Sequence, residues 1–173
     1  MRGLLPSQPA PPARNGPSRQ PTPREIVMER ARTGAESRSD TDRNPRSTAA
    51  GRYQFIGPTF RAYYRQLYPN SHETDEQINR RVTDGAIQER VMHAYIDDSE
   101  RMLTNAGIPI TPGHLYLLHV AGHPSGMQIL RNPDRPIREV LTAEAMSANP
   151  FGQRWTGHDL LNWTNRAMSP EED

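Results

Sequence analysis

The 173-residue sequence has no cysteine, no lysine and no long apolar run. Without cysteine there is no disulfide, no thiol nucleophile and no zinc-thiolate site. No apolar stretch is long enough to span a membrane, and the first residues lack the roughly 7 to 15 apolar residues of a signal peptide. The formal net charge is only +1, so the protein has no overall electrostatic field that would attract nucleic acid or an anionic membrane.

The N-terminal segment differs in composition from the rest of the chain. Residues 1–21 are rich in Pro, Arg, Ser and Gln and almost free of large apolar side chains. Such a segment buries too little surface to offset the entropy of ordering, so it predicts a disordered tail. Residues 22–169 have the size of one compact domain.

Helix start signals and apolar residues at helical spacing recur through that domain. Thr22 can cap a helix that begins at Pro23 and runs to about Glu36, with Glu25 completing a capping box. No stretch alternates with the period of two that a strand requires, so we expect a mainly α domain. Further helices are expected from Gly57, from Thr74 to about Asn105 with a break at Gly85, from Thr111 to Ala121 as the central buried helix, near residues 125–130, 137–141 and 143–148, and after Thr156.

A polar loop of fourteen residues, 37–50, follows the first predicted helix. A loop of this length in so small a domain is more often functional than idle. Glu36 stands where the helix meets the loop. A desolvated site raises the pKa of a carboxylic acid, and the negative end of a helix disfavours its ionised form. Glu36 is therefore the candidate proton donor for cleavage of a glycosidic bond.

The loop leads into a Gly-x-x-Gln turn and an aromatic-rich helix. Glu36 and Ser37, followed by Gly51 and Gln54 after the loop, form a pattern that resembles the soluble lytic transglycosylase and goose-type lysozyme superfamily, including its phage and prophage members. The resemblance implies a lysozyme-like single domain that cleaves peptidoglycan. It also implies Glu36 as the catalytic residue and a groove lined by Ser37, Gln54 and Tyr53.

A later segment extends the resemblance and also departs from it. Leu115 to Gly122 is similar to the family's Ala-Tyr-Asn-Ala-Gly helix, and residues 149–151 are similar to those of phage and prophage members. His119 and Val120 replace the family's Tyr-Asn pair, so an Asn that contacts sugar is missing. The resemblance implies that His119 takes the place of the family's Tyr and holds either Glu36 or an N-acetyl group of the substrate.

The number of catalytic carboxylates separates two mechanisms. Asp40 and Asp42 lie on the polar loop and can hold a water, although their sequence setting is typical of turns. If either aspartate is a second catalytic carboxylate beside Glu36, the protein would be a hydrolytic muramidase. If Glu36 is the single catalytic acid, the reaction would follow the family's transglycosylase route to a 1,6-anhydromuramoyl product. A third alternative is a non-catalytic binding or structural component of a virion or secretion apparatus.

The remaining residues predict neither a metal site nor a cofactor. The six histidines lack metal-ligand spacing with an acidic third ligand, and no phosphate-binding loop is present. The expected partners are peptidoglycan glycan strands, with no nucleic acid and no membrane span. The expected place of action is the periplasm or cell wall, reached through a signal removed from the chain, a phage particle or a secretion machine.

Overall fold

The computed structural model describes residues 19–32 and 39–170. Eight α-helices form within these ranges, and no strand does; three isolated β-bridges join loop residues. The expected mainly α class is confirmed. Residues 1–18 of the predicted tail lie outside the described residues.

The helices follow the order in which their start signals occur in the sequence. Their bounds are α1 Pro23–Arg30, α2 Gly57–Leu67, α3 Asp75–Arg81, α4 Gly85–Asn105, α5 Pro112–Ala121, α6 His123–Arg131, α7 Ala143–Ala148 and α8 Gly157–Met168, with a 3-10 turn at Ile137–Glu139. The expected break at Gly85 separates α3 from α4. The short helix expected near 137–141 is that 3-10 turn, and α1 continues only as a π turn at residues 31 and 32 before the described range ends.

Local capping explains several of these helix starts. The Thr22 side chain accepts from the backbone of Glu25, and the Glu25 side chain accepts in return from the backbone of Thr22. Thr74 and Gln77 form the same reciprocal pair at the start of α3. Each pair satisfies amide groups that the first helical turn leaves without an intrahelical acceptor.

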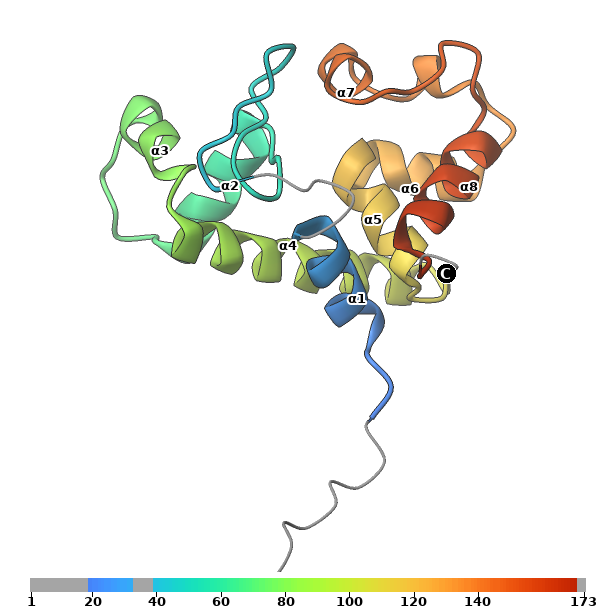
Figure 1. Cartoon of the computed structure of the whole chain (residues 1–173), viewed down its shortest axis with the longest axis horizontal. Helices are drawn as coiled ribbons and strands as arrows, with labels where there is room; N and C mark the ends of the chain where they lie inside the picture. The colour runs from blue at the N-terminus through green and yellow to red at the C-terminus, as the bar shows by residue number, and fades with distance from the viewer. Residues whose placement is uncertain (1–18, 33–38, 171–173) are drawn as a thin grey trace, which may run out of the picture.

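Helix α5 is the centre of the hydrophobic core. It packs against α1, α4, α6 and α8, and in Figure 1 it lies between α1 and α8 with the long α4 crossing beneath. Four consecutive residues, Leu115 to Leu118, are at most 2 % exposed. A helix that is apolar on all sides is stable only when it is covered on all sides, so the other helices assemble around it.

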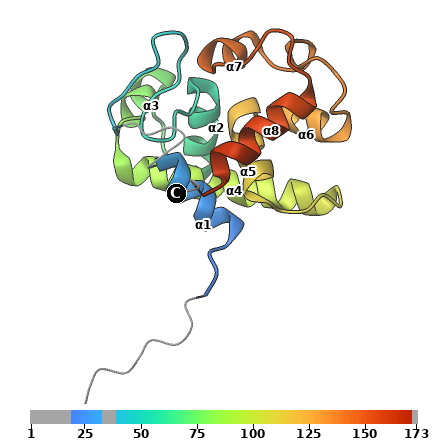
Figure 2. The ribbon, with the colours of Figure 1, turned by 45° about the vertical axis from the view of Figure 1, so that its right-hand side comes forward.

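The loop of residues 39–56 and helix α7 project to the same side of this core, as both ribbon views show (Figures 1 and 2). Hydrogen bonds join the loop and α7, one of them from the Thr48 hydroxyl to the Glu144 carboxylate. The Asn44 Nδ2 atom donates to the carbonyl of Ala148 at 3.1 Å, and the backbone N–H of Thr48 donates to the Glu144 carboxylate at 2.9 Å. The loop and α7 together therefore cover one end of α5.

No helix within residues 19–32 and 39–170 combines the length and apolar character that crossing a membrane requires.

Candidate functional site

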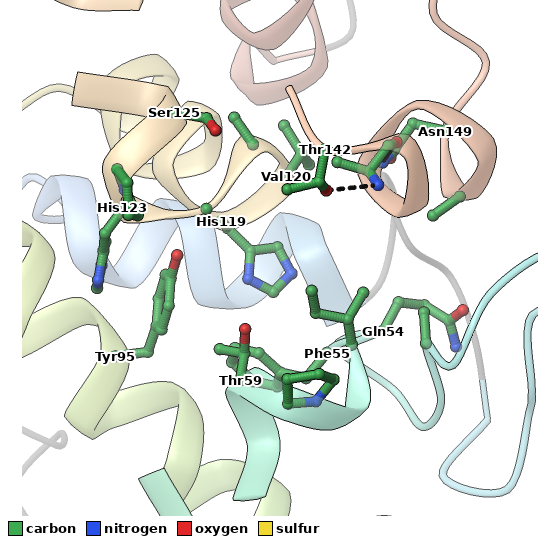
Figure 3. A pocket seen from close by; sticks show the side chains of 18 of the residues that line it. Gln54, Phe55, Thr59, Tyr95, His119, Val120, His123, Ser125, Thr142 and Asn149 are labelled. Atoms are coloured by element: carbon green, nitrogen blue, oxygen red, sulfur yellow. Dashed lines mark hydrogen bonds between the residues drawn. The ribbon is translucent and has the colours of Figure 1, made fainter. Parts of the chain in front are cut away.

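A cavity of about 460 Å³ lies beneath the loop and α7. This volume is within the range of small-molecule sites, roughly 300 to 1,000 Å³. Its wall comes from the loop and from helices α2, α4, α5, α6 and α7. Side chains that define it are Asn44, Gln54, Phe55, Thr59, Tyr63, Tyr95, His119, Val120, His123, Ser125, Thr142 and Asn149. In Figure 3 the His119 ring occupies the middle of the view, with Gln54 on one side and Tyr95 and His123 on the other.

The Gly-x-x-Gln turn forms the loop end of this cavity. Gly51 has a φ of 78° and Gln54 a φ of 53°, both in the left-handed region that L side chains rarely adopt. The Gln54 side chain supports its own backbone, because its Nε2 atom donates to the Gly51 carbonyl at 2.7 Å and to the Asp42 carbonyl at 3.4 Å. The turn is thus a strained but internally bonded structure.

Gln88 on α4 fastens the turn to the helical core. Its Oε1 atom accepts from the backbone N–H of Arg52 at 2.6 Å, and its Nε2 atom donates to the Asp40 carbonyl at 3.1 Å. The side chain is 1 % exposed. A buried amide that is bonded at both ends is costly to displace, so Gln88 determines how close the loop lies to α4.

His119 holds the turn from the other side. Its Nε2 atom lies 2.7 Å from the Tyr53 carbonyl oxygen, and its ring meets the Phe55 ring edge to face with centroids 4.9 Å apart. Burial lowers the pKa of His119 to about 4, only partly opposed by the bond to Tyr53. The imidazole is therefore neutral near pH 7. Sequence reasoning placed His119 at the site, and the structure does bring it together with Gln54.

Tyr53, which the resemblance placed in the lining of a groove, is not among the residues that line this cavity. The residue is 1 % exposed, and its hydroxyl donates to the Glu89 carboxylate at 2.6 Å. Burial is the main cause that raises the pKa of the phenol, followed by that bond. Tyr53 contributes its backbone carbonyl to the site through His119, while its ring belongs to the core.

Asp40 and Asp42 have structural partners. The Asp40 carboxylate receives the Arg52 guanidinium at 2.7 and 3.2 Å, and Arg52 continues to Glu89 at 2.8 Å. The Asp42 carboxylate accepts from the backbone N–H of Ser39 at 3.0 Å and from the Ser39 hydroxyl at 2.9 Å. Neither aspartate is among the residues that line the cavity.

Glu36 and Ser37 lie outside the described residues. The chain is described up to Arg32 on one side of them and from Ser39 on the other. The Glu29 carboxylate accepts a hydrogen bond from Arg32 and raises the pKa of its guanidinium. On the C-terminal side, Asp40 is paired with Arg52 of the Gly-x-x-Gln turn.

Sequence reasoning missed a second polar group in the cavity wall. The His123 ring stacks on Tyr95 with centroids 4.0 Å apart, and its Nε2 atom lies 2.8 Å from the Ser99 hydroxyl. Desolvation, followed by the positive charge of Arg101, lowers the pKa of His123 to about 4. Tyr95, Ser99 and Arg101 lie on α4 and His123 lies on α6, and no local spacing in the sequence signals that the two helices meet at this point.

Within residues 19–32 and 39–170, no three His, Cys, Asp or Glu side chains gather in a way that could hold a metal ion. Scans against protein-family models, curated proteins and solved structures found no match to this chain.

Proposed function

We propose that this chain is a lytic transglycosylase with a lysozyme-like helical domain, and that it cleaves the β-1,4 bond between the two amino sugars of peptidoglycan strands. The observation on which this depends most is the Gly51–Gln54 turn. It combines two left-handed residues with bonds to α4 and α5, and its Gln54 lines the cavity. Strain of this kind persists where the surroundings over-determine it, commonly at ligand sites.

Glu36 is the acid in this proposal. Among the described residues that line the cavity there is no Asp or Glu, so the wall itself offers no proton donor of carboxylic type. The segment that contains Glu36 leads to Asp40, whose carboxylate pairs with Arg52 inside the Gly-x-x-Gln turn. These two observations favour an acid supplied by that segment.

The chemistry then needs one acid that acts twice. Glu36 protonates the glycosidic oxygen as the bond to the muramoyl C1 breaks, and the neighbouring N-acetyl group stabilises the carbon. The Glu36 carboxylate next takes the proton of the muramoyl 6-hydroxyl as its oxygen attacks C1. The result is a 1,6-anhydromuramoyl end, with no water consumed and Glu36 again protonated.

The partners of Asp40 and Asp42 favour this route over hydrolysis. A muramidase would need one of them as a second catalytic carboxylate. Asp40 is engaged by Arg52, and Asp42 caps the turn at Ser39. Both groups have a structural role that explains their presence in the loop.

Digestion of purified peptidoglycan tests the proposal. The full chain should release fragments that carry anhydromuramoyl ends, which mass spectrometry identifies because each weighs one water less than the hydrolytic product. Glu36→Gln should abolish release with an unchanged circular dichroism spectrum. Glu76→Gln is the matched control, because the Glu76 side chain is 82 % exposed on α3. Activity retained by Glu36→Gln, or pull-down on peptidoglycan without release, would reject the proposal.

A further inference from the structure

The loop and helix α7 are bonded to each other above the cavity. The Glu144 carboxylate accepts hydrogen bonds from the backbone N–H and from the hydroxyl of Thr48. The Thr48 hydroxyl in turn accepts from the backbone N–H of Gly57 at 2.9 Å, and the Asn44 side chain donates to the Ala148 carbonyl. A carboxylate that accepts from two donors is a stronger link than a pair of neutral groups. The Thr48–Glu144 pair therefore forms a bridge between the loop and α7.

Further bonds complete a ring that begins and ends at this bridge. The His119 Nε2 atom on α5 lies 2.7 Å from the Tyr53 carbonyl oxygen of the loop. The Ser125 hydroxyl on α6 donates to the Val140 carbonyl at 2.9 Å. The chain itself joins α5 to α6 and Val140 to α7. The loop, α5, α6 and α7 are therefore linked in a closed ring, each to the next by a hydrogen bond or by the chain.

The cavity lies within this ring. In Figure 3, Thr142 and Asn149 on the α7 side lie across the cavity from Gln54 of the loop. Every segment of the ring contributes to the wall, as one residue from each illustrates: Ala49 from the loop, Val120 from α5, Pro124 from α6 and Ala145 from α7. Helix α2 and Tyr95 on α4 complete the wall.

A closed ring determines how a polymer can reach the cavity. The interior of a long strand continues on both sides, so it enters the ring sideways only when the ring opens. A strand end continues on one side only, so it can enter while the ring stays closed. The bonds of the bridge are exposed, whereas His119 and Ser125 make their bonds in part-buried positions. The bridge is therefore the point at which the ring would open.

We propose that the cavity receives a β-1,4-linked glycan strand by its end, and that the Thr48–Glu144 bridge excludes the interior of a strand. The class of polymer rests on the proposed function, whereas entry by the end rests on the ring alone. A chain of this kind shortens strands from their ends. Small fragments then appear from the first turnovers, and strands of intermediate length do not accumulate.

Because the sequence has no cysteine, the bridge can be locked by a reversible crosslink. Thr48→Cys and Glu144→Cys together place thiols where the native side chains touch. A bis-thiosulfonate reagent with a short spacer joins these thiols until a reductant releases them. Glu144→Cys alone, treated with the same reagent, is the matched control, because it is modified without closing the ring.

Calorimetric titration with N-acetylchitohexaose compares the locked ring with the open one. The hexaose carries biotin on a flexible spacer at each end, and monovalent streptavidin then blocks both ends. The crosslinked chain should bind the unblocked hexaose as tightly as the reduced chain does and should lose binding when the ends are blocked. The reduced chain and the control should bind both forms.

Three results of this titration would overturn the proposal. The crosslinked chain could fail to bind the unblocked hexaose, or it could bind the blocked form. Alternatively, opening the ring with reductant could leave the blocked form unbound. Each result would show that the bridge does not decide between the end and the interior of a strand.

Variants of Glu144 test the same bridge on purified glycan strands. Glu144→Gln keeps an oxygen that accepts from Thr48, so attack should stay at strand ends. Glu144→Ala removes that acceptor and should add interior cuts, which chromatography detects as strands of intermediate length. Glu76→Ala, at an exposed position on α3, is the control. Equal length distributions for the two Glu144 variants would contradict the role of the bridge.

The two experiments separate this inference from the proposed function. A chain that binds the hexaose by its end but releases no fragments from peptidoglycan would reject the proposed function and leave this inference standing. Fragment release by a chain whose locked ring also binds the blocked hexaose would do the reverse.

Discussion

The Nε2 atom of His119 lies 2.7 Å from the carbonyl oxygen of Tyr53, so the most buried helix of the domain holds the backbone of the Gly-x-x-Gln turn directly. The two residues are 66 positions apart in the sequence. The turn is fastened to α4 by Gln88 as well, and the stability of the core and the shape of the cavity therefore depend on the same few bonds.

Replacing His119 by Leu should destabilise the fold by roughly 1 to 3 kcal/mol, because the Tyr53 carbonyl would stay buried without its donor. His119→Gln should recover part of this loss, since an amide N–H can reach about the same position as the imidazole Nε2. Urea denaturation measures both variants. His93→Leu, at an exposed position on α4, is the control, and equal stability of His119→Leu and the unaltered chain would contradict the prediction.

The two partly buried histidines of the cavity wall, His119 and His123, predict a loss of stability in mild acid. Their pKa is lowered to about 4 in the folded chain by burial, against about 6.5 when unfolded. Between these values the unfolded state binds more protons, so the free energy of unfolding falls as pH falls from about 6.5 to about 4. One such histidine accounts for up to about 3 kcal/mol.

Urea midpoints measured across this pH range test the effect. His119→Gln should flatten the slope, whereas His93→Gln should leave it unchanged because that side chain is exposed. Slopes that match in the two variants would show that the buried imidazole is not responsible.

Gly51 and Gly107 form a matched pair for separating backbone strain from steric overlap. Both have a positive φ, 78° and 68°. A Cβ atom at Gly107 would meet nothing within 4 Å, whereas one at Gly51 would lie 2.6 Å from the Gln88 Cδ atom. Alanine should cost about 1 kcal/mol at Gly107 through strain alone, and about 1 to 3 kcal/mol more at Gly51 through overlap. Equal losses in thermal denaturation would show that Gln88 yields freely.

The elements that the sequence predicts well are those determined by neighbouring residues. The capping pair Thr22–Glu25 forms as expected because it depends on groups three positions apart. The helix start expected at Thr74 is stabilised by the same kind of pair with Gln77. The bounds of α7 match the expected 143–148 for the same reason. Gly85 begins α4 as the predicted break implies.

The features that the sequence does not predict depend on contacts between residues that are far apart in the chain. An aromatic side chain such as Tyr53 has the same local pattern in a groove or in a core, and its burial follows from Glu89, 36 positions away. The wall histidine His123 is likewise placed by Ser99 on another helix. The Gly-x-x-Gln motif identifies Gln54 as a site residue. Its left-handed backbone could not be predicted from the residue type, because glutamine rarely adopts that conformation.

That backbone conformation predicts an unusual order of stability at Gln54. Both Gln54→Ala and Gln54→Gly lose the side-chain bonds to Gly51 and Asp42. Only glycine also relieves the strain of a positive φ, which costs other residues roughly 1 to 2 kcal/mol. The glycine variant should therefore be the more stable of the two by about 1 kcal/mol in urea denaturation. At the exposed, helical His93 the order should reverse, because alanine is the better helix former by about 1 kcal/mol. If alanine is the more stable residue at both positions, the turn at Gln54 is not held in the left-handed conformation.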